Sequence, residues 1–247
     1  MLVILVMFIL GILLGFVGAG GAGFVIALLT VLFHTPIHTA LGTSLAAMAF
    51  TSLSGAYSHF REKNMRLKIG LIVGIFAAAG SFAGAKLSAF IPGSYLHYLT
   101  SGMLFLSAIL MLIKLFILKD RPEITGQEKN GEIWVRSIIL GLVSGVLSGT
   151  FGIGSAPFIQ LGLLILLNLT IRESVGTTML VILPIAIGGG IGYFSEGFVD
   201  PLLLVYVLIG TTAGAYIGAK FTNVAPKPIL KSSLILTPVI AAIILLF

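Results

Sequence analysis

The chain has 247 residues, of which 58% are hydrophobic and only 9% are charged. Because soluble domains carry about 25% charged residues, this composition excludes a water-soluble fold and predicts a multi-pass protein of the cell membrane. The net charge of +6 does not indicate a nucleic-acid partner, since the basic residues lie mostly in short segments between apolar runs, and the absence of cysteine excludes disulfides and thiolate metal sites.

The apolar segments follow one another along the chain. They run approximately over residues 2–33, 38–60, 67–90, 95–118, 133–167, 171–194, 201–222 and 228–247. A membrane-spanning helix needs about 20 apolar residues, so these lengths predict an all-α integral membrane protein. The one long polar stretch, 119–136, is interpreted as a cytoplasmic linker between a first membrane repeat (1–118) and a second (137–247). The start MLVILVMFILG has no basic n-region, so no removable signal peptide is expected.

The two halves are copies of one another. Adding 134 to a residue number brings GAGGAGF (Gly18–Phe24) onto GIGSAPF (Gly152–Phe158) without a gap. The same offset brings Gly42-Thr43 onto Gly176-Thr177, Glu62 onto Glu196, and the Gly-Ala-Lys ending in Lys86 onto the one ending in Lys220. Such gapless self-similarity predicts one structural unit used twice.

The basic residues indicate how the two copies are oriented. If all eight segments cross the membrane, the copies are parallel and the Lys and Arg residues divide between both faces. If 2–33 and 133–167 each enter and return on their own side, Lys86 is the only basic residue on the second face, as the positive-inside rule favours. We therefore expect inverted repeats, each a broken or re-entrant helical hairpin plus three transmembrane helices. The alternative stays open, because Leu2–Val17 is almost long enough to cross alone.

Each hairpin is interrupted by a glycine-rich break. Glycine tolerates the backbone angles of a break, Ser155 suits an N-cap, and Pro157 suits the first turn of a helix. A half-helix that begins there presents free N–H groups and a partial positive charge, which together form an anion site. The predicted substrate-binding backbone is Gly18, Ala19, Gly20, Gly21 and Ala22 in the first copy, and Gly152, Gly154, Ser155 and Ala156 in the second. The alternative is that these glycines only allow close helix packing.

Four hydroxyl residues complete the predicted site. Thr43 and Ser44 follow Gly42, and their counterparts Thr177 and Thr178 follow Gly176. They either donate to the oxygens of an anion or bond the backbone of their own helix.

Other polar residues have weaker interpretations. Lys86 and Lys220 read as interface anchors, with attraction of anions as the alternative, and Glu62 and Glu196 read as solvated. His34, His38, His59 and His97 lack metal-ligand spacing, with proton relay as an alternative for the first three. The GxGxxG at Gly18–Gly23 is a chance match without a βαβ unit. We expect no catalytic residues, no cofactor and no metal.

The motifs as a set resemble the sulfite exporter TauE/SafE family. They are GFVGAGGAGF with SGTFGIGSAPF, LGTS with VGTT, SGAYSHF before a basic loop, and the Gly-x-x-x-Gly-Ala-Lys segments that precede proline. The resemblance covers nearly the whole chain and implies a small secondary carrier for sulfite, sulfonates and related anions. The family often has arginine near the Gly-Ala-Lys position and Gly-Gly in the second break, where this chain has Lys86, Lys220 and Gly154-Ser155.

The expected function is export of a small sulfur-containing oxyanion by alternating access, with the anion held near the midplane between the two breaks. The alternatives are a passive anion channel and a membrane scaffold that transports nothing. The expected partners are the anion and the lipid bilayer. A coupling proton or cation and a second copy of the chain stay open.

Overall fold

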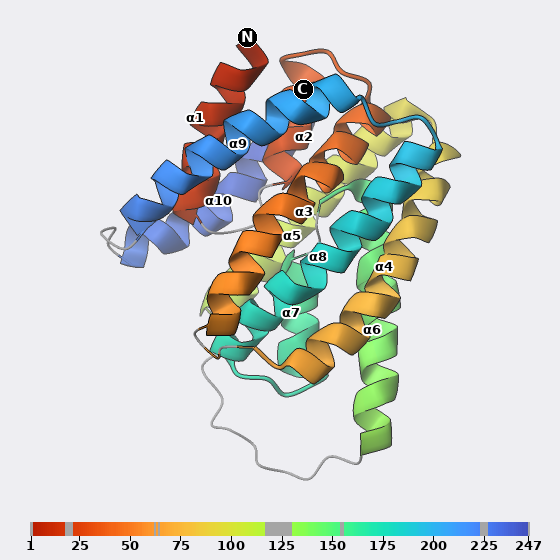
Figure 1. The fold of residues 1–247 in the computed structure, drawn as a ribbon, viewed down its shortest axis with the longest axis vertical. Helices are drawn as coiled ribbons and strands as arrows, with labels where there is room; N and C mark the ends of the chain where they lie inside the picture. Colours follow the sequence, from red (N-terminus) through yellow and green to blue (C-terminus); the bar gives the residue numbers. More distant parts are fainter. Residues whose placement is uncertain are drawn as a thin grey trace.

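The computed structural model describes residues 2–17, 22–61, 63, 65–116, 130–153, 156–222 and 227–246. Within these ranges it leaves out the side chains of 15–17, 54, 58, 114–116, 130, 171–172, 218–222, 227–231 and 233–234. The described part forms ten helices: α1 (Leu2–Val17), α2 (Ala22–Val31), α3 (Ile37–Arg61), α4 (Leu67–Ala89), α5 (Gly93–Phe116), α6 (Asn130–Phe151), α7 (Ala156–Ile165), α8 (Ile171–Ser195), α9 (Pro201–Thr222) and α10 (Lys227–Leu246) (Figure 1).

The helix boundaries repeat at the sequence offset of 134. Helices α2 and α7 have the same length and begin at the equivalent residues Ala22 and Ala156. Each is followed by a non-glycine residue in the left-handed region, His34 with φ 51° and its counterpart Asn168 with φ 50°. Such residues are uncommon, so their recurrence shows that the repetition extends to local backbone geometry.

Each half contributes one helix to two close pairs, α1 with α9 and α4 with α6 (Figure 1). A Cβ atom at Gly80 on α4 would lie 2.6 Å from Leu142 O and 3.0 Å from Val146 N of α6. A Cβ atom at the equivalent Gly214 on α9 would meet Phe8 O and Ile12 N of α1, again shifted by 134. Small residues let membrane helices approach to backbone contact. The two halves are therefore interlocked by equivalent contacts.

Helices α3 and α8 cross antiparallel in the middle of the fold (Figure 1). A Cβ atom at Gly189 would lie 3.0 Å from Leu45 Cδ1, and one at its counterpart Gly55 would lie 3.1 Å from Met179 Sδ. The start of α8 is held by a capping box, in which Thr170 Oγ1 accepts from Glu173 N at 3.3 Å and Glu173 Oε2 accepts from Thr170 N at 3.1 Å. This crossing brings the Gly-Thr pairs of both halves into the core.

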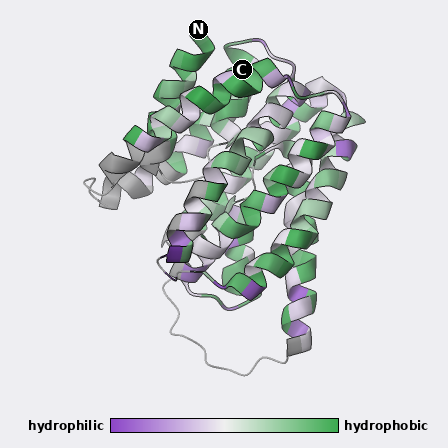
Figure 2. Cartoon of the chain, in the orientation of Figure 1, coloured by the Kyte–Doolittle hydropathy of each residue, from purple (hydrophilic) through white to green (hydrophobic). Residues whose placement is uncertain are grey.

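The outer surface has the character expected in lipid. Many large apolar side chains on it are exposed, among them Leu5, Ile75, Ile191 and Phe194. In the described ranges, four helices are long and apolar enough to cross a membrane: Leu67–Ala89, Gly93–Ile113, Gly131–Phe151 and Glu173–Ser195. Hydrophilic residues gather at the lower end of Figure 2, where α3 ends and α6 begins. The chain is thus a helical membrane protein with one strongly polar end.

The first arm of the second hairpin differs from expectation. Helix α6 begins at Asn130, inside the stretch interpreted as linker, and it extends below the other helices in Figure 1. Glu132 lies in its first turn, where a negative charge is favourable, and its Oε2 pairs with Arg136 Nη2 at 3.4 Å. Arg136 Nη1 also donates to Leu166 O at 3.1 Å, which ties the start of α6 to the loop after α7. Both arms of this hairpin therefore meet at its base, although α6 is long enough to span alone.

Candidate functional site

The structure describes about half of the predicted site. Ala22, Thr43, Ser44, Gly152, Ala156, Thr177 and Thr178 are described, whereas Gly18, Ala19, Gly20, Gly21, Gly154 and Ser155 lie outside the described residues.

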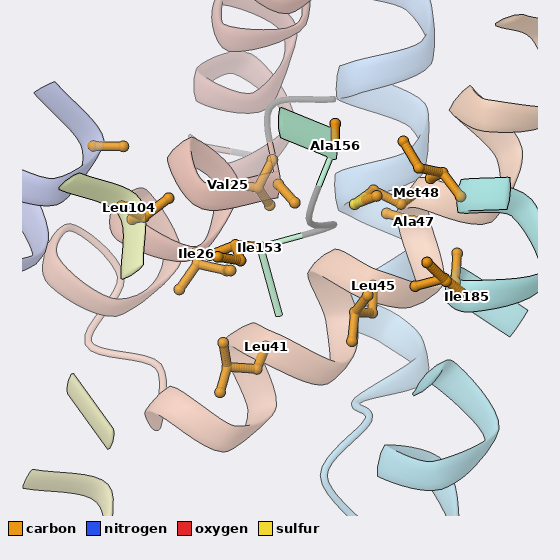
Figure 3. Packing of buried hydrophobic residues seen from close by; sticks show 14 of the residues in the cluster. Val25, Ile26, Leu41, Leu45, Ala47, Met48, Leu104, Ile153, Ala156 and Ile185 are labelled. Carbon is orange, nitrogen blue, oxygen red and sulfur yellow. The ribbon is translucent and has the colours of Figure 1, made fainter. Parts of the chain in front are cut away.

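The break after α6 requires glycine at its first position. Gly152 has φ 66°, and its N–H donates to Ser148 O at 2.7 Å, which closes the last turn of α6. A Cβ atom there would lie 2.5 Å from Leu41 Cδ2 and 3.2 Å from Ile26 Cδ1. Figure 3 shows the next residue, Ile153, in the buried apolar cluster that also contains Ile26 of α2 and Leu41 of α3. The chain therefore leaves α6 through a tight, apolar gap, where a residue with a Cβ atom would be strained by the positive φ and would have to displace the end of Leu41.

Helices α2 and α7 both begin inside the protein. Their first residues, Ala22 and Ala156, are 2% and 6% exposed. The first N–H groups of a helix have no acceptor within the helix and carry a partial positive charge. Two short helices thus place their positive ends in the buried part of the molecule at repeat-equivalent positions.

Helix α3 touches both hairpins with one face. Ser44 Oγ donates to Ala22 O at 3.0 Å, which ties α3 to the first residue of α2. Leu41, one turn earlier on the same face, is the residue that closes over Gly152. The Ser44 hydroxyl therefore holds the start of α2, and its one proton is used in that bond.

The remaining three hydroxyls have different surroundings in the described residues. Thr178 Oγ1 donates to Ser174 O of its own helix at 2.7 Å, the alternative expected for a helical threonine. Thr177 Oγ1 accepts the backbone N–H of Arg66 at 3.0 Å, at the start of α4. Thr43 is fully buried, and its Oγ1 has no hydrogen-bond partner in the described part of the chain.

Helix α4 is fastened to α8 at both of its ends. At one end Arg66 Nε pairs with Glu173 Oε1 at 2.6 Å, beside the Thr177 bond. At the other end Lys86 Nζ pairs with Glu196 Oε1 at 2.6 Å. Lys86 is thus held by the carboxylate of Glu196. The interpretation of Lys86 as an interface anchor did not predict this partner.

The repeat makes the contact of α9 with α3 equivalent to that of α4 with α8, but the two contacts differ. The counterpart of Arg66 is Asp200, whose Oδ1 accepts from Leu202 N at 2.9 Å and Leu203 N at 3.1 Å and so caps its own helix. Thr43, the counterpart of Thr177, has no hydrogen-bond partner among the described residues. Ile185 on α8 is fully buried, whereas its counterpart Thr51 on α3 is exposed. Two interfaces that the repeat makes equivalent are therefore closed to different extents.

The remaining candidates from the sequence are the histidines and the pair formed by Lys220 and Glu62, the counterparts of Lys86 and Glu196. His38 Nε2 donates to Ser88 O at 3.0 Å and to Ile91 O at 3.2 Å, and its ring stacks on Phe198 with 4.7 Å between centroids, so it holds the end of α4 to the loop after α8. In the described ranges no three His, Asp or Glu side chains are placed to hold a metal ion. The side chain of Lys220 and all of Glu62 lie outside the described residues.

Two buried polar residues near the hairpins were missed. Gln160 in α7 is 5% exposed, and its counterpart in α2 is the apolar Ile26. The hydroxyl of Tyr193, also fully buried, lies 2.9 Å from Ser88 Oγ and 3.3 Å from Thr150 O near the end of α6. The sequence signal for Gln160 was a single amide side chain in an otherwise apolar ten-residue helix.

Comparison with known proteins covers the whole length of the chain. A family model described as sulfite exporter TauE/SafE matches residues 3–245. The chain is 71% identical over its full length to a Bacillus subtilis protein of the same length named probable membrane transporter protein YdhB. It is 30% identical to the B. subtilis probable membrane transporter protein YjnA, over 92% of each chain. It is 31% identical to the Methanocaldococcus jannaschii probable membrane transporter protein MJ0441, over 80% of this chain and 74% of the relative. No solved structure gives a significant match.

Proposed function

The chain belongs to the sulfite exporter TauE/SafE family, and from this premise we propose that it is a secondary transporter, working as an exporter, for a small sulfur-containing oxyanion such as sulfite or an organosulfonate. The family and its relatives are membrane transporters by name. The observation that carries the proposal for the cargo is the pair of buried helix starts at Ala22 and Ala156. Buried N–H groups and helix dipoles attract an anion without a buried lysine.

The two halves are inverted relative to one another in this proposal. Support comes from the antiparallel crossing of α3 and α8, which are equivalent helices that run in opposite directions. A parallel duplication would make equivalent helices run the same way. Inversion places the two breaks about a pseudo-twofold axis, so that one anion near the midplane meets both helix starts.

Transport requires two states: in one the interface of α4 with α8 is closed, and in the other the equivalent interface of α9 with α3 is closed. In the described structure α4 is fastened to α8 by Arg66, Thr177 and Lys86, whereas α9 is not fastened to α3 at Thr43. In the second state Thr43 accepts the N–H at the start of α9, and the Arg66–Glu173 ion pair has no equivalent there because Asp200 stands in the place of Arg66. Because the two interfaces are related by the repeat, the two states are close in energy, as alternating access requires.

The anion site itself combines backbone and side-chain groups. We assign the substrate to the breaks at Gly18–Ala22 and Gly152–Ala156, with Ser44 at the edge of the first. Thr177 and Thr178 act on the helix contacts around the site, because their hydroxyls bond Arg66 N and Ser174 O. Thr43 keeps a buried hydroxyl with no partner among the described residues.

Flux in proteoliposomes tests this function. We expect labelled sulfite or a small sulfonate to move faster than in protein-free vesicles, to saturate with concentration, and to show counterflow against unlabelled anion. An imposed pH gradient reports whether a proton is coupled. Flux without saturation or counterflow would identify a channel, and no flux of any sulfur oxyanion in either direction would overturn the proposal.

A further inference from the structure

A cavity of about 400 Å³ lies between the starts of α4 and α6, at the polar end of the molecule and away from the breaks. Its wall is formed mainly by Ile69 and Ile72 of α4 with Ile133 and Trp134 of α6, and Arg66 and Lys68 also line it. The lower ends of α4 and α6 in Figure 1 mark its position. The cavity is thus apolar inside and basic at one edge.

The charges at this edge are not all balanced within the described part of the chain. Arg66 is paired with Glu173, but Lys68 is exposed and makes no ion pair in the described part of the chain. Trp134 is 45% exposed and lies on the same cavity, as tryptophans do at membrane interfaces. The Lys68 ammonium group can bind the phosphate of a lipid, and the apolar wall beside Trp134 can hold the acyl chain of the same lipid.

The repeat provides an internal comparison. The residues that occupy the equivalent place at the start of α9 are Asp200 for Arg66 and Leu202 for Lys68. The same fold therefore exists without the basic pair, and with a carboxylate that repels phosphate. The basic edge is a property of this end of the protein, where the basic residues concentrate, and anionic lipids are attracted to juxtamembrane Lys and Arg side chains.

We propose that this cavity binds an anionic phospholipid, with its phosphate at Lys68 and one acyl chain between Ile72 and Ile133. The proposal does not depend on which anion the protein transports. It makes Lys68 a lipid-selecting residue and Trp134 a neighbour of the bound acyl chain.

The lone tryptophan of the chain makes a direct test available. The full-length protein is reconstituted in phosphatidylcholine vesicles that contain a small, equal fraction of either brominated phosphatidylglycerol or brominated phosphatidylcholine, and quenching of Trp134 is measured. We expect stronger quenching by the brominated phosphatidylglycerol, with an excess that declines as salt is added. Equal quenching by the two lipids would overturn the proposal.

Two matched variants locate the effect. Lys68→Gln is expected to lower the relative affinity for phosphatidylglycerol about fivefold, the effect of roughly one basic side chain at a membrane surface. Lys63→Gln removes the same charge from an exposed position that does not line the cavity and is expected to keep the excess. An excess that survives Lys68→Gln unchanged, or is lost equally in Lys63→Gln, would show that bulk surface charge and not the cavity selects the lipid.

Discussion

Gly152→Ala is expected to abolish transport while the protein still inserts into the membrane. Gly152 has φ 66°, where a residue with a Cβ atom costs about 1–2 kcal/mol. The added carbon would also lie 2.5 Å from Leu41 Cδ2 on α3. Relieving both effects moves the chain that joins α6 to the buried start of α7, so the anion site is displaced. Sulfite flux in proteoliposomes measures the loss, and the amount of protein in the membrane checks insertion.

Two variants separate the causes at this position. Gly152→Asn introduces a residue that tolerates the left-handed region but still has a Cβ atom. If the contact with Leu41 causes the loss, this variant should also lose transport. Leu41→Ala, added to Gly152→Ala, removes the side chain that closes the gap and should restore part of the flux. Gly102→Ala in α5, where an added Cβ atom meets nothing within 4 Å, is the matched control and should transport normally. Normal flux in Gly152→Ala would remove this break from the site.

Gly145→Val is expected to destabilise the whole fold. A Cβ atom at Gly145 on α6 would meet the backbone of Ala77 on α4, and backbone cannot rotate away as a side chain can. Overpacking of this kind costs about 1–3 kcal/mol, at the upper end where backbone is struck. The repeat-equivalent Gly11, whose Cβ atom would lie 2.6 Å from Thr211 O on α9, should respond in the same way to Gly11→Val.

Thermal unfolding in detergent measures this effect. Both valine variants should unfold at lower temperature than the parent, whereas Gly102→Val should differ little because its position is open. If Gly145→Val lowers the unfolding temperature and Gly11→Val does not, the two helix pairs are not equivalent. A stable Gly145→Val protein would contradict the close α4–α6 contact itself.

Breaks and helix ends were predictable because they depend on local backbone chemistry. Glycine at 152 predicted an interruption, and α6 ends at Phe151 with Gly152 in the left-handed region. The start of a half-helix near Pro157 was predicted in the same way, and α7 begins at Ala156. Polarity alone did not predict that α6 begins inside the expected linker. Glu132 and Arg136 are polar, as linker residues are, but their ion pair stabilises the first turn of the helix.

Side-chain partners were less predictable because they depend on which helices meet. Thr177 and Thr178 occupy the positions that repeat Thr43 and Ser44, but Thr177 bonds the start of α4 and Thr178 bonds its own helix. Nothing in one half of the chain indicates that α4 lies beside α8. The ion pair of Lys86 with Glu196 carried a usable signal, since both residues have counterparts at the same offset in the other half.

The inversion of the two halves is the central claim, and labelling of single cysteines tests it most directly. His34 and Asn168 are repeat-equivalent, exposed and already in the left-handed region, and the chain has no cysteine of its own. His34→Cys and Asn168→Cys are each treated with a membrane-impermeant maleimide, first on intact cells and then after permeabilisation. Inversion predicts that His34→Cys reacts in intact cells, and that Asn168→Cys, at the basic end, reacts only after permeabilisation. Reaction of both cysteines from the same side would contradict it.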